Sequence, residues 1–289
     1  MSNFINYNWM PSIADHCWDA SEEFYSNAGV SRVHNKDHLN PDDIKDNDII
    51  FVKTDYIYHG DFVTLLNVIK SKFTLISAIS SYNVGLGHPN YINILNSDKL
   101  KYWFCTNPPD VKSSKLVGLP IGFEEEDREG GNQEVIKKHW DKKPQWEDKI
   151  NKLYLSYHTL GNNPDRDKNI KYLSSLEFVH VEKNKLSFDK YLEEMSKYKY
   201  TICLEGSGFD THRNYESLLV GSIPIMIQST VKSIYDEWNL PSIFVKEWKE
   251  IDENFVTNKA KETNPLLLNV ENFLKIDSHK EKILKYASR

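Results

Sequence analysis

Short β-branched runs alternate with amphipathic segments along this 289-residue chain, and this alternation restricts its fold more than any other feature. Residues 49–52 and 73–79 are apolar runs typical of buried strands, and residues 62–72 between them have the apolar spacing of a helix. A strand, a helix and a second strand in succession predict a βαβ unit in a parallel sheet. The same pattern predicts a short helix at 91–95 and strands at 102–105 and 115–121.

A strongly charged stretch, residues 124–152, interrupts the alternation and contains Gly130, Gly131 and Pro144 but no strand pattern. The alternation then restarts, with strands expected at 152–157, 178–181, 200–204, 223–227 and 243–245, and helices at 167–175, 187–198, 211–220 and 232–238. We therefore expect an α/β protein made of two Rossmann-like domains, with parallel sheets that face each other across a cleft. The expected domains are residues 1–140 and 141–265, followed by a C-terminal helix within 266–289 that packs back on the first domain.

Charge and cysteine content exclude several classes of protein. Lys and Arg number 36 against 42 Asp and Glu, so the net charge of −6 offers no basic field for nucleic acid. Cys17, Cys105 and Cys203 form no CxxC pattern and are odd in number, which argues against a disulfide framework and favours a reducing compartment. No signal-like N-terminus and no window approaching the ~18 apolar residues of a membrane span is present. A cytoplasmic location without a membrane span is the expectation.

The segment after the expected strand at 200–204 has the pattern of an anion site. The strand leads into Glu205, Gly206, Ser207 and Gly208, and Asp210 or Thr211 can cap the helix that follows. Backbone N–H groups in the first turn of a helix have no partner within the helix and bind anions. In open α/β sheets, ligands bind at the carboxyl ends of the strands. The sequence therefore predicts that an anionic ligand binds here.

Arg213 and Glu216 are one turn apart in that predicted helix. A cation in the first turn opposes the helix dipole, and a bound anion would offset this cost. The structural alternative is an ordinary intrahelical ion pair, but Arg preceding Glu is the weaker orientation for such a pair. We therefore favour binding roles, in which the guanidinium grips a diphosphate and the carboxylate accepts hydrogen bonds from ribose hydroxyls.

Residues 200–225 resemble the donor-site segment of exostosin-like glycosyltransferases, including small virus-encoded members, and are distantly similar to the donor motif of α1,3-fucosyltransferases. The resemblance is strong over 153–227 and weaker over 49–123. It implies a GT-B fold, a nucleotide-sugar substrate such as a UDP-sugar, Arg213 as a phosphate ligand and Glu216 as a ribose ligand. Arg166 matches a second phosphate-binding arginine of the fucosyltransferase-like pattern, the alternative being a solvated arginine at a helix start.

An inverting transfer needs a base that takes the proton of the acceptor hydroxyl. Asp55 and His59 follow the strand at 49–52, while His88 and Glu124 follow other strand ends. Related enzymes often carry a carboxylate in the turn after the strand equivalent to 73–79, but this chain has Ser, Ser, Tyr, Asn, Val and Gly at 80–85. We rank Asp55 first, then His59 and His88.

Metal ligands are not expected. Asp46 with Asp48, and Asp165 with Asp167, fit an Asp-x-Asp pattern but are interpreted as turn or cap residues. The histidines and cysteines have no zinc-ligand spacing. We therefore expect no cofactor and no metal.

The function predicted from these features is a hexosyl- or pentosyltransferase that is inverting and metal-independent and acts on a carbohydrate hydroxyl. Two alternatives stay open. One is a nucleotide-sugar epimerase-like enzyme, which would share the donor site but use no acceptor; the other, kept open by the departure at 80–85, is a catalytically inactive module that binds sugar nucleotides or glycans.

Overall fold

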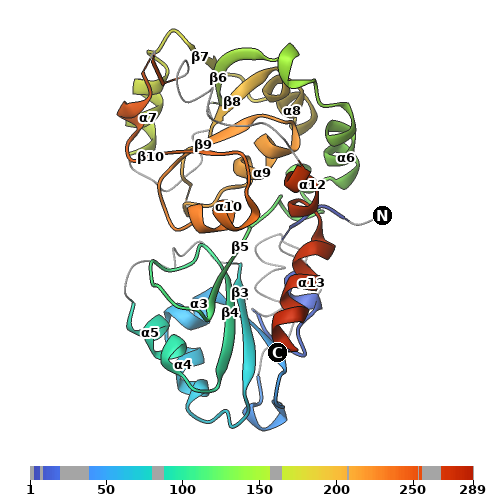
Figure 1. Ribbon diagram of the computed structural model, residues 1–289, viewed down its shortest axis with the longest axis vertical. Helices are drawn as coiled ribbons and strands as arrows, with labels where there is room; N and C mark the ends of the chain where they lie inside the picture. Colours follow the sequence, from blue (N-terminus) through green and yellow to red (C-terminus); the bar gives the residue numbers. More distant parts are fainter. Residues whose placement is uncertain are drawn as a thin grey trace. The chain divides into compact units, whose positions relative to one another are not determined.

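The computed structural model describes residues 3–6, 9–19, 39–79, 88–156, 165–206, 208–252, 254–255 and 268–288. The chain divides into two compact units, unit 1 comprising Met1–Ile121 with Ile276–Arg289, and unit 2 comprising Gly122–Lys275. Each unit contains one five-stranded sheet, and all the strand pairs in both sheets are parallel (Figure 1). The expected α/β fold with parallel sheets is confirmed.

The sheet of unit 1 has its strands in chain order, namely β1 (His16–Trp18), β2 (Ile49–Lys53), β3 (Phe73–Ala78), β4 (Leu100–Thr106) and β5 (Leu116–Leu119). Because every crossover steps in the same direction, the connecting helices gather on one face of the sheet. These are α3 (Thr54–Tyr58), α4 (Asp61–Leu66) and α5 (Pro89–Asn96), whose apolar side chains share one core with Val52, Leu75 and Trp103.

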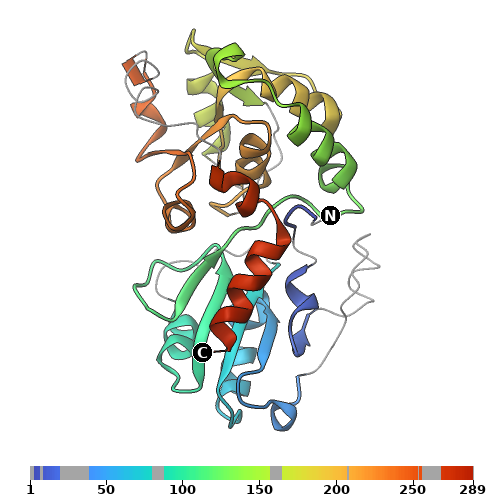
Figure 2. The same cartoon turned by 45° about the vertical axis from the view of Figure 1, so that its right-hand side comes forward.

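Helix α13 (Ile276–Ala287), at the other end of the chain, packs on the opposite face of this sheet (Figure 2). The ring of Tyr286 lies 4.8 Å from that of Tyr102 and 5.6 Å from that of Phe104. Trp103, between these two residues in β4, points to the other face, which α3, α4 and α5 cover. Lys101 Nζ donates to the carbonyl of Ala287 at 2.8 Å. The short helix α1 (Trp9–Ser12) also approaches α13, with the Trp9 ring 6.1 Å from that of His279. The first sheet is thereby covered on a face that its own crossovers leave open.

The sheet of unit 2 has the order β10-β9-β8-β6-β7, with β6 (Ile150–Ser156), β7 (Val179–Glu182), β8 (Tyr198–Ile202), β9 (Ile223–Ile227) and β10 (Ile243–Val245). From β6 the chain passes to β7 on one side and then returns to β8 on the other side. The strand order therefore reverses between β6 and β8, and such a switch point opens a crevice at the carboxyl ends of the two strands. The sequential order of the described strands in unit 1 contains no such reversal.

The remaining α-helices belong to unit 2. They are α6 (Gln133–Lys142), α7 (Arg166–Leu173), α8 (Phe188–Ser196), α9 (His212–Leu219), α10 (Lys232–Trp238) and α12 (Leu268–Phe273). Unit 2 also contains the 3-10 turns η2 (Glu129–Gly131), η3 (Trp146–Asp148) and η4 (Trp248–Glu250), and unit 1 contains η1 (Pro41–Asp43). The helix expected at 62–72 ends early, at Leu66, because Ser71 Oγ bonds the carbonyl of Ile44 and Lys72 N bonds Asp46 Oδ1, both at 2.8 Å.

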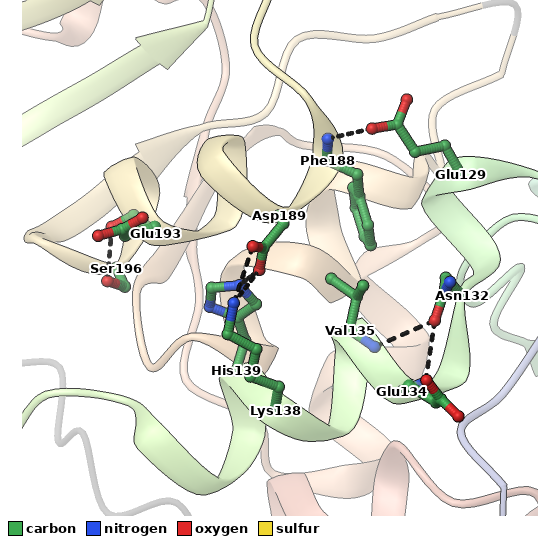
Figure 3. Close-up of polar contacts among 10 residues, drawn as sticks. All are labelled: Glu129, Asn132, Glu134, Val135, Lys138, His139, Phe188, Asp189, Glu193 and Ser196. Carbon is green, nitrogen blue, oxygen red and sulfur yellow. Dashed lines mark hydrogen bonds and ion pairs between the residues drawn. The ribbon is translucent and has the colours of Figure 1, made fainter.

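Helix α6 lies in the charged stretch, where the sequence pattern indicates no regular element. Asn132 Oδ1 caps it by accepting from the backbone N–H groups of Glu134 and Val135 at 3.0 and 3.1 Å. His139 Nε2 and Lys138 Nζ both contact the carboxylate of Asp189 on α8, at 2.7 and 2.6 Å (Figure 3). Two polar residues of α6, in a stretch whose charge is typical of a linker, thus bind α6 to α8.

Lys149 is buried at the carboxyl ends of two helices in unit 2. Its Nζ donates to the carbonyl of Ser196, the last residue of α8, and at 2.8 Å to that of Val220, directly after α9. A cation at helix C-termini is favourable, yet burial and, secondarily, Lys143 lower the pKa of Lys149 to about 8.

This lowered pKa predicts a specific pH dependence of stability. The unfolded chain binds more protons at Lys149 than the folded chain between pH 8 and 10.5, so this group's contribution to stability rises with pH across that window. The slope is at most about 1.4 kcal/mol per pH unit. In chemical denaturation, Lys149→Met should remove this rise, whereas the exposed Lys152→Met should retain it. Equal slopes for wild type and Lys149→Met would contradict the assignment.

Candidate functional site

The loop that follows β8 lies at the switch point of the second sheet. Gly206 N donates to the carbonyl of Gly208 at 3.1 Å, and Arg166 Nη1 donates to the carbonyl of Glu205 at 2.7 Å. Burial raises the pKa of Glu205. Ser207, which was expected to bind the donor, lies outside the described residues. An arginine that follows β6 therefore holds the backbone of the loop that follows β8.

Asp210 and Thr211 fix the loop to helix α9. The Asp210 side chain is 4% exposed, and its carboxylate accepts from Asn214 Nδ2 at 2.9 Å and from the Tyr215 hydroxyl. Thr211 occupies the N-cap position, but its hydroxyl donates to Asn214 Oδ1 at 3.0 Å and caps no backbone N–H. No side chain of the described residues caps a backbone N–H group in the first turn of α9. An anion could take that place.

Arg213 and Glu216 both bind the hydroxyl of one tyrosine on α8. Tyr191 donates to Glu216 Oε2 at 2.9 Å and accepts from Arg213 Nε at 3.1 Å. The structure contains no ion pair between Arg213 and Glu216, so the intrahelical pair is not formed among these described side chains. Arg213 is also partly buried, not the surface cation that its sequence position suggests.

The surroundings of Arg213 favour its charged form, whereas those of Glu216 disfavour its charged form. Burial raises the pKa of Glu216, while Arg213, His212 and the Tyr191 hydrogen bond lower it in part. Burial acts to lower the pKa of Arg213, but Tyr191 and Glu216 more than compensate and raise it above its usual value. The site therefore holds a permanent cation beside a carboxylate whose charge depends on its neighbours.

Arg166 is the first residue of α7 and is only 7% exposed, so it is not a solvated helix-start arginine. Its Nε is buried and has no hydrogen-bond partner among the described residues. Burial and then the charge of Arg213 lower the pKa of Arg166. Arg166 contacts the loop after β8, and Arg213 lies in the first turn of the helix that this loop leads into, so both cations belong to the same end of the sheet.

Asp55, His59 and His88, the candidate bases, come together in unit 1. Asp55 lies in the first turn of α3 and His59 at its C-terminal end, while His88 is the N-cap of α5. The Tyr58 ring lies 5.4 Å from that of His59 and 5.0 Å from that of His88. The ring of Tyr91 lies 5.3 Å from that of His88. His59 and His88 therefore border one aromatic cluster with Tyr58 and Tyr91, and Asp55 lies on the same short helix as Tyr58.

Within this cluster, Asp55 has a carboxylate oxygen that is not used for structure. Its Oδ1 lies 3.8 Å from Lys53 Nζ, whereas its Oδ2 is buried without a hydrogen-bond partner among the described residues. Burial raises the pKa of Tyr91, and Tyr58, Cys105 and Asp55 raise it further, so Asp55 faces this cluster. Residues 80–85, where related enzymes often carry a carboxylate, lie outside the described residues.

Glu124 lies in unit 2, apart from the other candidate bases. A Cβ added at Gly130 would lie 2.5 Å from Glu124 Oε2, so the Glu124 side chain lies directly against this glycine. Its charge also raises the pKa of Glu216. Glu124 is therefore a neighbour of the Tyr191–Glu216 pair.

Of the aspartates in the Asp-x-Asp patterns, Asp46 and Asp48 make turn contacts, whereas the Asp165 side chain makes no capping hydrogen bond among the described residues. Asp46 Oδ1 accepts from Lys72 N, and Asp48 Oδ2 accepts from Lys45 N and His16 Nε2, each at 2.8 Å. Asp165 is the N-cap of α7, and Asp167 is exposed. Within the described ranges, no group of three or more His, Cys, Asp or Glu side chains could hold a metal ion.

Tyr191 and His212 are residues of this site that sequence reasoning missed. His212 Nδ1 donates to the carbonyl of Gly122 at 2.8 Å, and it was overlooked although it lies inside the motif. Tyr191 has no local signal, because it lies on the helix before β8 and reaches α9 only through the packing of α8 against α9.

Comparisons with known proteins add little to this geometry. No protein-family model and no curated protein matches the chain. Among solved structures, a crystal structure of the GtfA/B complex is similar at 10% identity and a TM-score of 0.43, covering 86% of this chain. This chain spans 59% of the length of that one. The fold and site define a two-unit parallel α/β protein with two arginines beside the loop at a switch point of the second sheet.

None of the helices that the structure describes combines the length and apolar character that crossing a bilayer requires.

Proposed function

We propose that this protein is a glycosyltransferase that transfers a sugar from a nucleoside diphosphate donor, a UDP-sugar, to a carbohydrate hydroxyl with inversion. The observation that carries the proposal is that Arg166 and Arg213 flank the loop after β8: Arg166 Nη1 donates to the carbonyl of Glu205 at 2.7 Å, and Arg213 lies in the first turn of α9. Glu216 already accompanies Arg213, and a further anion would offset the repulsion between the two guanidinium groups. A diphosphate fits this requirement, because each guanidinium can grip phosphate oxygens in bidentate fashion.

The donor side follows from these residues. Arg166, Arg213 and the uncapped N-terminus of α9 would hold the diphosphate and stabilise the negative charge that grows on it as the glycosidic bond breaks. Glu216 would accept hydrogen bonds from the ribose hydroxyls. Loop residues Glu205, Gly206, Ser207, Gly208, Asp210 and Thr211 would shape the site around the nucleotide.

We assign the acceptor side to unit 1, where the partly buried ring of Tyr58 offers an aromatic face for a sugar and the neighbouring candidate bases serve its hydroxyl. In the transfer, the acceptor oxygen forms a bond to the anomeric carbon while the bond from that carbon to the diphosphate oxygen breaks. The hydroxyl proton passes to a base of the protein, for which Asp55 is the first candidate, and the nucleoside diphosphate leaves.

Thermal unfolding with a panel of nucleotides tests the proposal. A ligand at 100 times its dissociation constant stabilises the folded state by about 2.7 kcal/mol, so UDP should raise the unfolding midpoint measurably. Product analysis with a carbohydrate acceptor should then detect a new glycosidic bond, since an inactive module would bind without turnover and an epimerase would change only the donor. The absence of a shift with every nucleoside diphosphate and nucleotide sugar would refute the proposal.

We further expect transfer to persist in EDTA, since Arg166 and Arg213 supply the positive charge that the diphosphate leaving group needs. The measurement is the initial rate of transfer after exhaustive chelation, with and without added Mn²⁺. Loss of activity on chelation that Mn²⁺ restores would contradict this expectation.

A further inference from the structure

We propose that Tyr191 is a positioning residue of the donor site, whose hydroxyl holds the phosphate-binding Arg213 and the ribose-binding Glu216 apart in their working positions. This inference rests on the proposed function. Tyr191 belongs to α8 and is 7% exposed, so its ring is anchored in the core of unit 2. Among the described residues, its hydroxyl hydrogen-bonds both side chains, Glu216 Oε2 at 2.9 Å and Arg213 Nε at 3.1 Å.

A hydroxyl is suited to this position because it both donates and accepts. It donates to the Glu216 carboxylate and, through its lone pair, accepts from Arg213 Nε. Both neighbouring groups are then engaged on the side that faces α8. Within the described part of the chain the hydrogen bond of Arg213 uses Nε alone, which leaves the two terminal guanidinium nitrogens available to a ligand there.

Without this hydroxyl, the helix geometry favours a different arrangement. Residues three apart on a helix are neighbours, so Arg213 and Glu216 could approach each other and form a direct ion pair. That pair would occupy both the guanidinium and the carboxylate. The structure avoids it by placing a neutral hydroxyl between them, so that both side chains keep capacity for a ligand.

The consequence is a distinctive pattern of defects. Tyr191→Phe should weaken binding of both uridine and inorganic pyrophosphate, each by about tenfold, the usual effect of losing a hydrogen bond to a charged group. Glu216→Gln should weaken uridine but spare pyrophosphate, because the tyrosine still holds Arg213. Arg213→Lys should weaken pyrophosphate but largely spare uridine. Titration calorimetry measures all of these affinities.

The pH profile supplies a readout that a purely structural role would not move. The groups that act on Glu216 are Arg213 and His212 on α9, Tyr191 on α8 and Glu124 in the loop before η2. The Tyr191 bond lowers the pKa of Glu216, so Tyr191→Phe should raise it and move the acid limb of uridine binding to higher pH. The same titration in Glu216→Gln should lack the acid limb that is due to the carboxylate.

Tyr154→Phe is the matched control. Tyr154 is a fully buried tyrosine whose ring lies 6.3 Å from that of Tyr191, and its hydroxyl has no hydrogen-bond partner among the described residues. This variant should bind both ligands like the wild type. If Tyr191→Phe is too unstable to purify, difluorotyrosine placed at position 191 serves instead. It retains the hydroxyl as a stronger donor and should move the acid limb to lower pH.

The outcomes separate the two proposals. If the wild type binds neither UDP nor uridine, the proposed function fails and this inference fails with it. If the wild type binds both, but folded Tyr191→Phe has unchanged affinities and an unchanged acid limb, the donor site stands and the role of Tyr191 is refuted. The expected result is that Tyr191→Phe binds both uridine and pyrophosphate more weakly and shows a shifted acid limb of uridine binding. Tyr154→Phe should behave like the wild type.

Discussion

Arg213→Ala is expected to lower kcat/KM for sugar transfer by about 1,000-fold while the protein remains folded, a loss typical of removing one key electrostatic group from a charge-stabilising site. Arg213 is the permanent cation of the site, with a pKa raised by Tyr191 and Glu216 despite burial. Its removal leaves Arg166 alone to meet the charge of the leaving diphosphate. Arg213→Lys should restore only part of the activity, since a point charge does not reproduce a bidentate grip.

Stability must be measured in the same experiment, because Arg213 also has a structural contact. Alanine removes the hydrogen bond to Tyr191 and leaves Glu216 buried without its cation, so Glu216 should take up a proton and unfolding should require about 1–3 kcal/mol less. The control is Arg128→Ala, which removes a half-exposed arginine paired with Glu125 at 3.5 Å. Unfolding of Arg213→Ala without a loss specific to transfer would show that the residue serves the fold instead.

The strands and helices near the chemistry were largely predictable from the sequence. β9, α10 and β10 begin and end at the residues expected from the pattern, because each is a short periodic run bounded by breakers. β8 ends at Ile202, two residues before the expected end, since the chain leaves the sheet for the donor loop there. β1 was missed because a three-residue strand containing a histidine has no periodic signal.

Helix α6 was missed for a different reason. Its charged face makes the stretch resemble a linker, and only the Asn132 cap and the buried Ile136 mark it as a helix within a core. Its contact with Asp189 on α8 joins residues that are 50 apart in the chain. Local sequence patterns do not contain such a contact.

The candidate site was predictable in its residue types but not in its contacts. The loop, Arg213 and Glu216 were identified from strand, glycine and helix signals, and the contact of Arg166 with the loop that leads to Arg213 requires the strand order 10-9-8-6-7. Tyr191 is 22 residues from Arg213 and 25 from Glu216. Its role depends on how two helices pack, which periodicity does not specify.

Asp55→Asn is expected to lower kcat by about 100-fold or more with donor affinity retained, because the defect lies in proton transfer and not in holding the nucleotide. Asp55 is the candidate base whose Oδ2 has no partner among the described residues, whereas His88 Nδ1 already accepts from Asn90 N at 3.3 Å. Asparagine keeps the shape and the polar contact with Lys53 but cannot accept a proton.

The pH profile of kcat should also change in this variant. If Asp55 is the base, transfer requires its ionised form, so the wild-type rate falls on the acidic side as the carboxylate takes up a proton, and Asp55→Asn should lack this acidic limb. Asp61→Asn is the matched control, since Asp61 is an exposed carboxylate in the first turn of α4. Near-normal turnover in Asp55→Asn would exclude Asp55. Parallel measurements on His59→Gln and His88→Gln would then show which imidazole beside Tyr58 accepts the proton.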